Sequence, residues 1–142
     1  WDENSPDYNK DIFDEGSPYD FEYFQWFIPC LKDKDMANKL ASILRQNPTA
    51  FMELDYAKSD SDYVHLPCDS VDSLNSFIYP AVKALVDSSL DYRIKQQGKD
   101  GRWPLGWSLG EGEGFRKLQA LYEASRTAKM LVKLEKFGRI EI

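Results

Sequence analysis

Acidic, thiol and imidazole groups that could do chemistry lie close together between residues 60 and 72. Asp60 and Asp62 form an Asp-x-Asp pair, and His65 precedes Cys68 by three residues, with Asp69 next to the cysteine. These residue types could supply a nucleophile, a general base or a metal ligand. One histidine and two cysteines are too few for a zinc site, and the acids lack the ligand spacing and the glycine of a calcium loop. We therefore interpret this segment as a solvated turn, and we expect no metal ion and no cofactor.

A second group of acids lies in the glycine-rich run GEGEG at residues 110–114. Such a run invites comparison with phosphate-binding loops, but Glu111 and Glu113 would repel a phosphate and no strand precedes them. The acids instead favour the N-terminus of the helix that follows. If the chain has a catalytic acid, the candidates are Asp60, Asp62 and Glu111.

Composition and charge limit the classes of function. The chain of 142 residues is 42% hydrophobic and 14% aromatic, which is enough for one core but hardly for two. The net charge of −6 divides into −7 over residues 1–35, −4 over residues 36–92 and +5 over residues 93–142. The overall acidity and the interleaving of acids with bases argue against nucleic-acid binding. We expect no membrane-spanning segment and, because no secretory signal is visible, a cytoplasmic location by default.

The first half of the chain begins with an acidic segment, residues 1–18, that shows no apolar period and that we expect to be extended. Residues 19–31 are a dense aromatic stretch in which Phe21, Phe24 and either Phe27 or Ile28 share a helical face, and which Pro29 should end or bend. The next helix should be capped by Asp33 and end before residues 47–48. A short segment over residues 48–56 and a polar loop over residues 58–73 follow.

The second half holds two longer helical patterns. Residues 72–97 form one, broken by Pro80, and its second part places these apolar residues on one face: Val82, Leu85, Val86, Leu90 and Ile94. Residues 98–114 form a glycine-rich loop, and residues 115–134 form the clearest helix, with Gly138 as its C-cap. Spacing predicts ion pairs between Glu135 and Arg139 and between Glu123 and Arg126. No segment shows sustained strand alternation, so the fold class is all-α.

The two cysteines carry a separate expectation. Cys30 and Cys68 are too few to indicate a disulfide scaffold, and their disulfide state is left open. We expect both to be buried thiols.

The run LDYRIKQQGKDGRW, residues 90–103, carries a resemblance to a known family. Gln97, Asp100, Gly101 and Trp103 match the core of the Gln-Trp repeat of squalene and oxidosqualene cyclases, and residues 104–140 are similar to the final helix of cyclase-like proteins. In that family the glutamine satisfies backbone groups at a helix end and the tryptophan stacks on it. The resemblance implies that residues 19–142 belong to an α/α toroid of the terpenoid-cyclase and prenyltransferase type.

The match to this family is partial. The Asp-x-Asp-Asp and Asp-Asp-x-x-Asp motifs of terpenoid cyclases and synthases are absent from the sequence. A toroid of six helical hairpins needs on the order of twice this length, so we expect an incomplete or half toroid. A second copy of the chain, another partner chain or a missing portion would complete it.

The resemblance implies that the chain binds or transforms an apolar, isoprenoid-like substrate in an aromatic pocket. Cation–π attraction from such rings would stabilise a carbocation, and the rings that could line the pocket are Tyr92, Trp103, Trp107 and Tyr122. Core packing explains the same rings without a pocket. The alternative function is a non-catalytic helical interaction subunit whose stretch at residues 19–31 docks on a partner protein.

Overall fold

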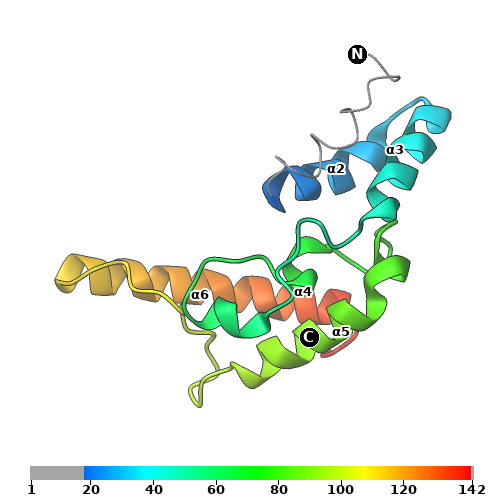
Figure 1. Ribbon diagram of the computed structural model, residues 1–142. Coiled ribbons are helices and arrows are strands. Elements are labelled where there is room, and N and C mark those ends of the chain that lie inside the picture. The colour runs from blue at the N-terminus through cyan, green and yellow to red at the C-terminus, as the bar shows by residue number, and fades with distance from the viewer. Residues whose placement is uncertain (1–17, 142) are drawn as a thin grey trace.

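The computed structural model describes residues 18–141 of the chain and shows an all-α fold (Figure 1). The elements in chain order are α2 (Pro18–Cys30), α3 (Lys34–Gln46), the 3₁₀ helix η1 (Tyr56–Asp60), α4 (Pro67–Ser70), α5 (Tyr79–Lys95) and α6 (Glu113–Lys136). Within the described residues there is no strand, which confirms the predicted class. The predicted extended segment 1–18 lies outside the described residues except for Pro18, which begins α2.

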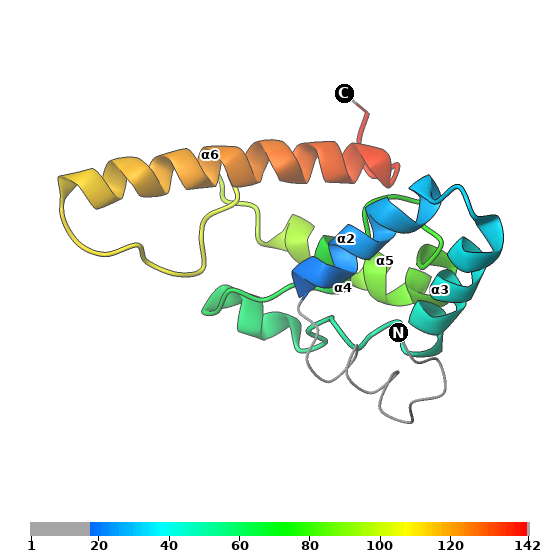
Figure 2. The same ribbon diagram turned by 90° about the horizontal axis from the view of Figure 1, so that it is seen from above.

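Helices α2 and α3 lie next to each other at one end of the molecule (Figures 1 and 2). The carboxylate of Asp33 accepts hydrogen bonds from the backbone N–H groups of Asp35 and Met36, both at 3.0 Å, which confirms the predicted cap of α3. Phe21 is fully buried and stacks on Phe51 with ring centroids 5.3 Å apart. Ile28, rather than Phe27, shares this buried face.

Helix α4 packs between α2 and α5, and the buried Gln25 connects α2 to this layer. The Gln25 side-chain amide donates to the Ser70 carbonyl, and its oxygen accepts from the Ser76 hydroxyl at 2.8 Å. The sequence predicted a helix from residue 72 with a break at Pro80, and this is wrong: residues 72–78 form turns and Pro80 lies in the first turn of α5. A proline is tolerated there because its missing N–H would have had no partner within the helix.

The buried face of α5 differs from the predicted one at its C-terminal end. Val82, Val86 and Leu90 are buried as expected, but Ile94 is 38% exposed and Arg93 takes the buried position. Arg93 continues the period of three to four residues that Val82 begins, so the helical phase places the arginine inward. A charged group is thereby carried into the core, where it needs partners.

The loop over residues 96–112 is fixed to the helices at two points. The Trp103 indole is 2% exposed, and its N–H donates to the Arg93 carbonyl at the end of α5, at 2.6 Å. Gly101 has a φ of +82°, which favours glycine, and its carbonyl accepts from the Gln97 amide at 2.9 Å. At Gly106 an added Cβ would lie 2.6 Å from the Asp60 carbonyl, so the loop packs closely against η1.

Helix α6 contributes to the core through its C-terminal half. Met130 and Leu134 in that half are buried. Leu118 and Leu121 in the N-terminal half are 42% and 68% exposed, and the N-terminal half extends beyond the other helices (Figures 1 and 2). Gly138, with a φ of +65°, ends the helix as predicted. The predicted pair of Arg139 with Glu135 is wrong, because Arg139 instead bonds Asp91 at the surface of α5.

Trp103 provides a stability test of the loop. We expect Trp103→Phe to lower the free energy of unfolding by roughly 2–3 kcal/mol, because the smaller phenyl ring leaves a cavity and the hydrogen bond to the Arg93 carbonyl is lost. Urea unfolding followed by circular dichroism measures this change. The matched control is Trp26→Phe, at a ring that is 57% exposed, where we expect a change within about 0.5 kcal/mol. Equal effects of the two substitutions would contradict the structural role of Trp103.

Candidate functional site

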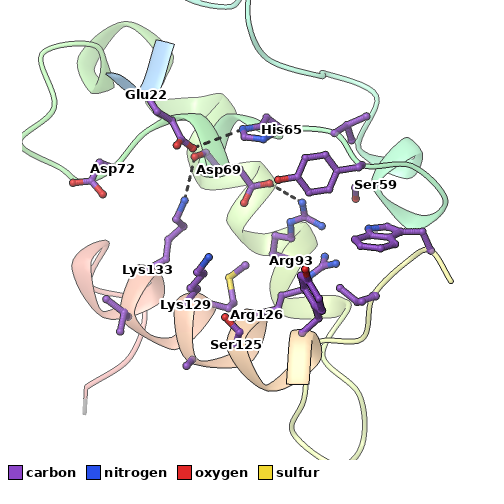
Figure 3. A pocket seen from close by; sticks show the side chains of 18 of the residues that line it. Glu22, Ser59, His65, Asp69, Asp72, Arg93, Ser125, Arg126, Lys129 and Lys133 are labelled. Atoms are coloured by element: carbon purple, nitrogen blue, oxygen red, sulfur yellow. Dashed lines mark hydrogen bonds and ion pairs between the residues drawn. The ribbon is translucent and has the colours of Figure 1, made fainter. Parts of the chain in front are cut away.

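A cleft of about 1050 Å³ separates α6 from the rest of the molecule (Figure 3). One wall is the inner face of α6, and the other comes from α2, the segment over residues 59–72 and α5, with the loop at residues 105–107 closing one end. Few backbone atoms of α6 approach the other helices, so the two walls are joined mainly by long side chains. The charged and aromatic side chains of the lining include Asp62, Asp69, Arg93, Trp107, Tyr122, Arg126, Lys129 and Lys133.

The floor of the cleft is an ion pair between α5 and α4. Arg93 is 5% exposed and its Nη2 lies 2.6 Å from Asp69 Oδ2, while its Nη1 donates to Gln96 Oε1 at 3.0 Å. Burial raises the pKa of Asp69, but the positive charges of Arg93 and Lys133 outweigh burial and hold that pKa below its ordinary value. Asp69 Oδ2 also accepts from the backbone N–H of Leu66 at 3.2 Å. The carboxylate therefore fixes the start of α4 and holds Arg93 in place.

Cys68 next to this pair does not have the properties of a nucleophile. Its side chain is buried, and burial, followed by the negative charge of Asp69, raises the pKa of the thiol to about 12. A thiol with that pKa is protonated at neutral pH and unreactive. Cys30 is exposed, which corrects the prediction that both cysteines are buried. The reason is that Cys30 ends α2 on the side facing away from the core.

Basic side chains of α6 face the ion pair from the opposite wall. Figure 3 shows Arg126, Lys129 and Lys133 projecting from α6 toward Asp69 and Arg93. The Lys133 ammonium donates to the Cys68 carbonyl and, at 3.3 Å, to the Asp69 carbonyl, which ties α6 to α4. These two contacts cross the cleft and set its width.

The predicted pair of Glu123 with Arg126 is wrong. Glu123 instead accepts from the Gln119 amide at 3.1 Å and lies 3.7 Å from Arg102 of the glycine-rich loop. Residues three apart on a helix can meet, but Arg126 lines the cleft whereas Glu123 does not. The guanidinium of Arg126 is therefore part of the cleft lining rather than of an ion pair with Glu123.

An aromatic cluster forms the end of the cleft near the loop. The Trp107 ring lies 6.4 Å from the Tyr122 ring and 6.3 Å from the Tyr63 ring, with edge-to-face geometry in both pairs. Tyr122 is 49% exposed and Tyr63 65% exposed. Rings in this arrangement hold each other in place while leaving apolar area open to a ligand.

The structure brings only some of the predicted site residues to the cleft. Of the four predicted substrate-binding rings, Trp107 and Tyr122 line it. Trp103 belongs to the core, and Tyr92 packs against Tyr56, with ring centroids 5.7 Å apart, outside the cleft lining.

The three candidate acids are also divided. Asp62 lines the cleft. Asp60 accepts from the Tyr92 hydroxyl at 2.8 Å and from the Gln96 amide, so its oxygens hold η1 against α5. Glu111 is exposed in the loop before α6 and is not part of the cleft lining.

Sequence reasoning missed the basic residues of the site. Arg93 and Lys129 were counted only as part of the positive charge of residues 93–142, and Arg126 was assigned to a pair with Glu123. One signal was available: Arg93 follows the apolar positions of α5 at helical spacing, which places a charge on the inward face. Arg126 and Lys129 follow Tyr122 on α6 at similar spacing.

Comparisons with known proteins identify no relative of this chain. No protein family, curated protein or solved structure matches the chain. Within residues 18–141, no three His, Cys, Asp or Glu side chains gather as a metal ion would require. None of the helices in this range combines the length and apolar composition needed to cross a bilayer.

The lowered pKa of Asp69 predicts a pH dependence of stability. Because the folded-state pKa lies below the ordinary value of 3.8, the pair stabilises the fold above that value and the gain is lost as the pH falls through the folded-state pKa. We expect Asp69→Asn to cost about 3–5 kcal/mol near pH 7, since Arg93 is left buried without its partner. The cost should shrink below about pH 4.

Urea unfolding of both proteins between neutral and acid pH measures this difference. The matched control is Asp72→Asn, at a carboxylate that pairs with Lys136 at the surface and is 50% exposed. It should change stability much less at every pH. A cost of Asp69→Asn that is the same at neutral and acid pH would contradict the ion-pair account.

Proposed function

We propose that the cleft binds an apolar small molecule, and that the chain is a terpenoid-cyclase-like helical domain in which the substrate class is isoprenoid-like. The observation that carries the proposal is the aromatic cluster of Tyr63, Trp107 and Tyr122 at one end of a cleft of about 1050 Å³. That volume lies in the range of small-molecule sites, and apolar area removed from water contributes about 25 cal/mol per Å².

Contacts around the glycine-rich loop support the family part of the proposal. The Gln97 amide bonds the Gly101 carbonyl and the Trp103 indole bonds the last turn of α5. In the Gln-Trp repeat the glutamine satisfies backbone groups at a helix end and the tryptophan stacks on it, so the contact of Gln97 resembles the family pattern and that of Trp103 is a hydrogen bond instead. The same contacts would also suit any loop that must be held rigid next to a binding cleft.

The exposed half of α6 supports completion of the domain by further helices. Phe115, Leu118 and Leu121 are between 42% and 68% exposed on the part of α6 that extends beyond the other helices. In an α/α toroid such a face would pack on a neighbouring helix, from a second copy, a partner chain or another portion. Asp62 is the predicted acid that a reaction in the cleft would use, because it alone of the three lines the cleft.

Binding of a neutral apolar fluorophore tests the proposal. We expect N-phenyl-1-naphthylamine to bind the chain with a rise in its fluorescence, and Trp107→Ala or Tyr122→Ala to weaken binding about tenfold, equivalent to about 1.4 kcal/mol. The control is Leu121→Ala, next to Tyr122 in sequence but outside the cleft lining, which should leave the affinity unchanged. Equal losses in all three variants, or no binding to the unaltered chain, would refute the proposed site.

The second candidate function is a helical interaction subunit, favoured by the outer face of α2. Tyr23 and Phe27 are 60% and 55% exposed, are one helical turn apart and lie on the side opposite the buried Phe21. Exposed aromatic rings grouped in this way are typical of protein interfaces.

Light scattering over a dilution series tests this second function. If α2 is a docking surface, the unaltered chain should self-associate, and Tyr23→Ser with Phe27→Ser should shift the mass toward the monomer. The matched control, Leu118→Ser with Leu121→Ser on α6, should leave the mass unchanged. A monomer at all concentrations would count against α2 as a docking surface, and dissociation by the α6 pair alone would favour completion through α6.

A further inference from the structure

Arg126 is a partly buried cation that has no hydrogen-bond or ion-pair partner in the described part of the chain. Within residues 18–141, its guanidinium makes no hydrogen bond and no salt bridge. Burial lowers the pKa of Arg126, and the nearby charge of Arg93 lowers it further, so its surroundings disfavour the positive charge. Arginine remains charged in proteins nevertheless, and a partly buried guanidinium usually has a carboxylate partner. Among the side chains of residues 18–141, the cleft therefore presents a positive group that is left for a ligand to pair with.

Arg93 adds a second positive charge near Arg126. Its two Nη groups bond Asp69 and Gln96, but its Nε, which is fully buried, has no hydrogen-bond partner among the described residues. Arg93 is 5% exposed and lines the cleft. Because the Nε has no area exposed to the cleft, Arg93 contributes positive charge to the floor rather than a free donor to a ligand.

The charges that line the cleft indicate the charge of the ligand. Five bases and four acids line it, a balance of +1 at neutral pH: Arg93, Arg126, Lys129, Lys133 and Lys136 against Glu22, Asp62, Asp69 and Asp72. Two of these bases are already in ion pairs, Arg93 with Asp69 and Lys136 with Asp72. One added negative charge would balance the cleft, whereas a phosphate dianion or a diphosphate would leave it negative.

The apolar part of such a ligand has a place next to Arg126. Tyr122 and Met130 lie one turn before and one turn after Arg126 on α6, and both line the cleft. From Tyr122 the aromatic surface continues to Trp107. A ligand with its charged end at Arg126 would lay its apolar body along these side chains.

We propose that the ligand of the cleft is an amphipathic monoanion, an apolar body with one carboxylate, and that Arg126 binds the carboxylate, with Arg93 adding positive charge at the floor. This inference rests on the proposed binding of an apolar molecule in the cleft and adds the chemical class of its head group. A guanidinium can donate two parallel hydrogen bonds to one carboxylate, which makes Arg126 suited to this head group.

Displacement of bound N-phenyl-1-naphthylamine by three ligands of equal chain length tests the head group. The ligands are decanoate, decanol and decyl phosphate. We expect decanoate to bind the unaltered chain at least tenfold more tightly than decanol, and more tightly than decyl phosphate. Arg126→Gln should abolish the advantage of decanoate over decanol while leaving the affinity for decanol unchanged, which also shows that the variant is folded.

The matched control is Arg116→Gln, which removes the same charge from the exposed start of α6, outside the cleft lining. It should keep the full preference for decanoate. Equal binding of decanol and decanoate to the unaltered chain would overturn the inference and leave the proposed function intact. Tighter binding of decyl phosphate would overturn the choice of a monoanion. Failure of the neutral fluorophore itself to bind would overturn the proposed function, and this inference with it.

Discussion

The ion pair between Arg93 and Asp69 is the interaction on which the rest of the site depends. It joins α5 to α4, with Arg93 Nη2 and Asp69 Oδ2 2.6 Å apart, and each of the two residues makes a further hydrogen bond. The Asp69 carboxylate also caps α4 through Leu66, and the Arg93 backbone carbonyl accepts from the Trp103 indole. A buried pair of this kind gains little over an apolar contact, but it is costly to break. It therefore fixes one geometry among several that a helical core of this size could adopt.

The cleft follows from how α6 is attached to this core. The Lys133 ammonium holds the helix by donating to the carbonyls of Cys68 and Asp69. The backbone N–H of Trp103 adds a hydrogen bond to the Thr127 hydroxyl at 3.1 Å. Long side chains keep the backbone of α6 apart from those of α4 and α5, whereas small apolar residues would have allowed these helices to pack closely. The space between them is lined by rings at one end and by cations in the middle, and these two kinds of surface give the proposed ligand its two ends.

Local features of the fold could be predicted from the sequence. Asp33 caps α3, Gly138 ends α6 and the glycine-rich segment forms a loop, because each depends on residues within a few positions of one another. The role of Pro80 was misjudged, because a proline inside a helical pattern and a proline in the first turn look alike until the helix start is known. Residues 72–78 have enough apolar side chains to suggest a helix, but they form turns instead.

The site itself was only partly predictable. Trp107 and Tyr122 were among the expected rings, but Arg126 was expected to pair with Glu123, and Arg93 was not singled out. Pairing of Arg93 with Asp69 spans 24 positions, and no local pattern reports such a contact. The same holds for Glu123, which Arg102 approaches from the loop. Sequence spacing ranks local pairs, whereas the fold decides which charges are left for a ligand.

The central claim, that the cleft between α6 and the ion pair is a binding site for an apolar molecule, can be tested most directly by NMR. The chain has four tryptophans, and each indole N–H gives one signal in a ¹⁵N-labelled sample. During titration with decanol, the Trp107 signal should shift progressively, because its ring lines the cleft. The Trp103 signal should stay in place, because that N–H is buried and bonded to the Arg93 carbonyl. A Trp107 signal that does not move, or a Trp103 signal that moves as far, would contradict the account.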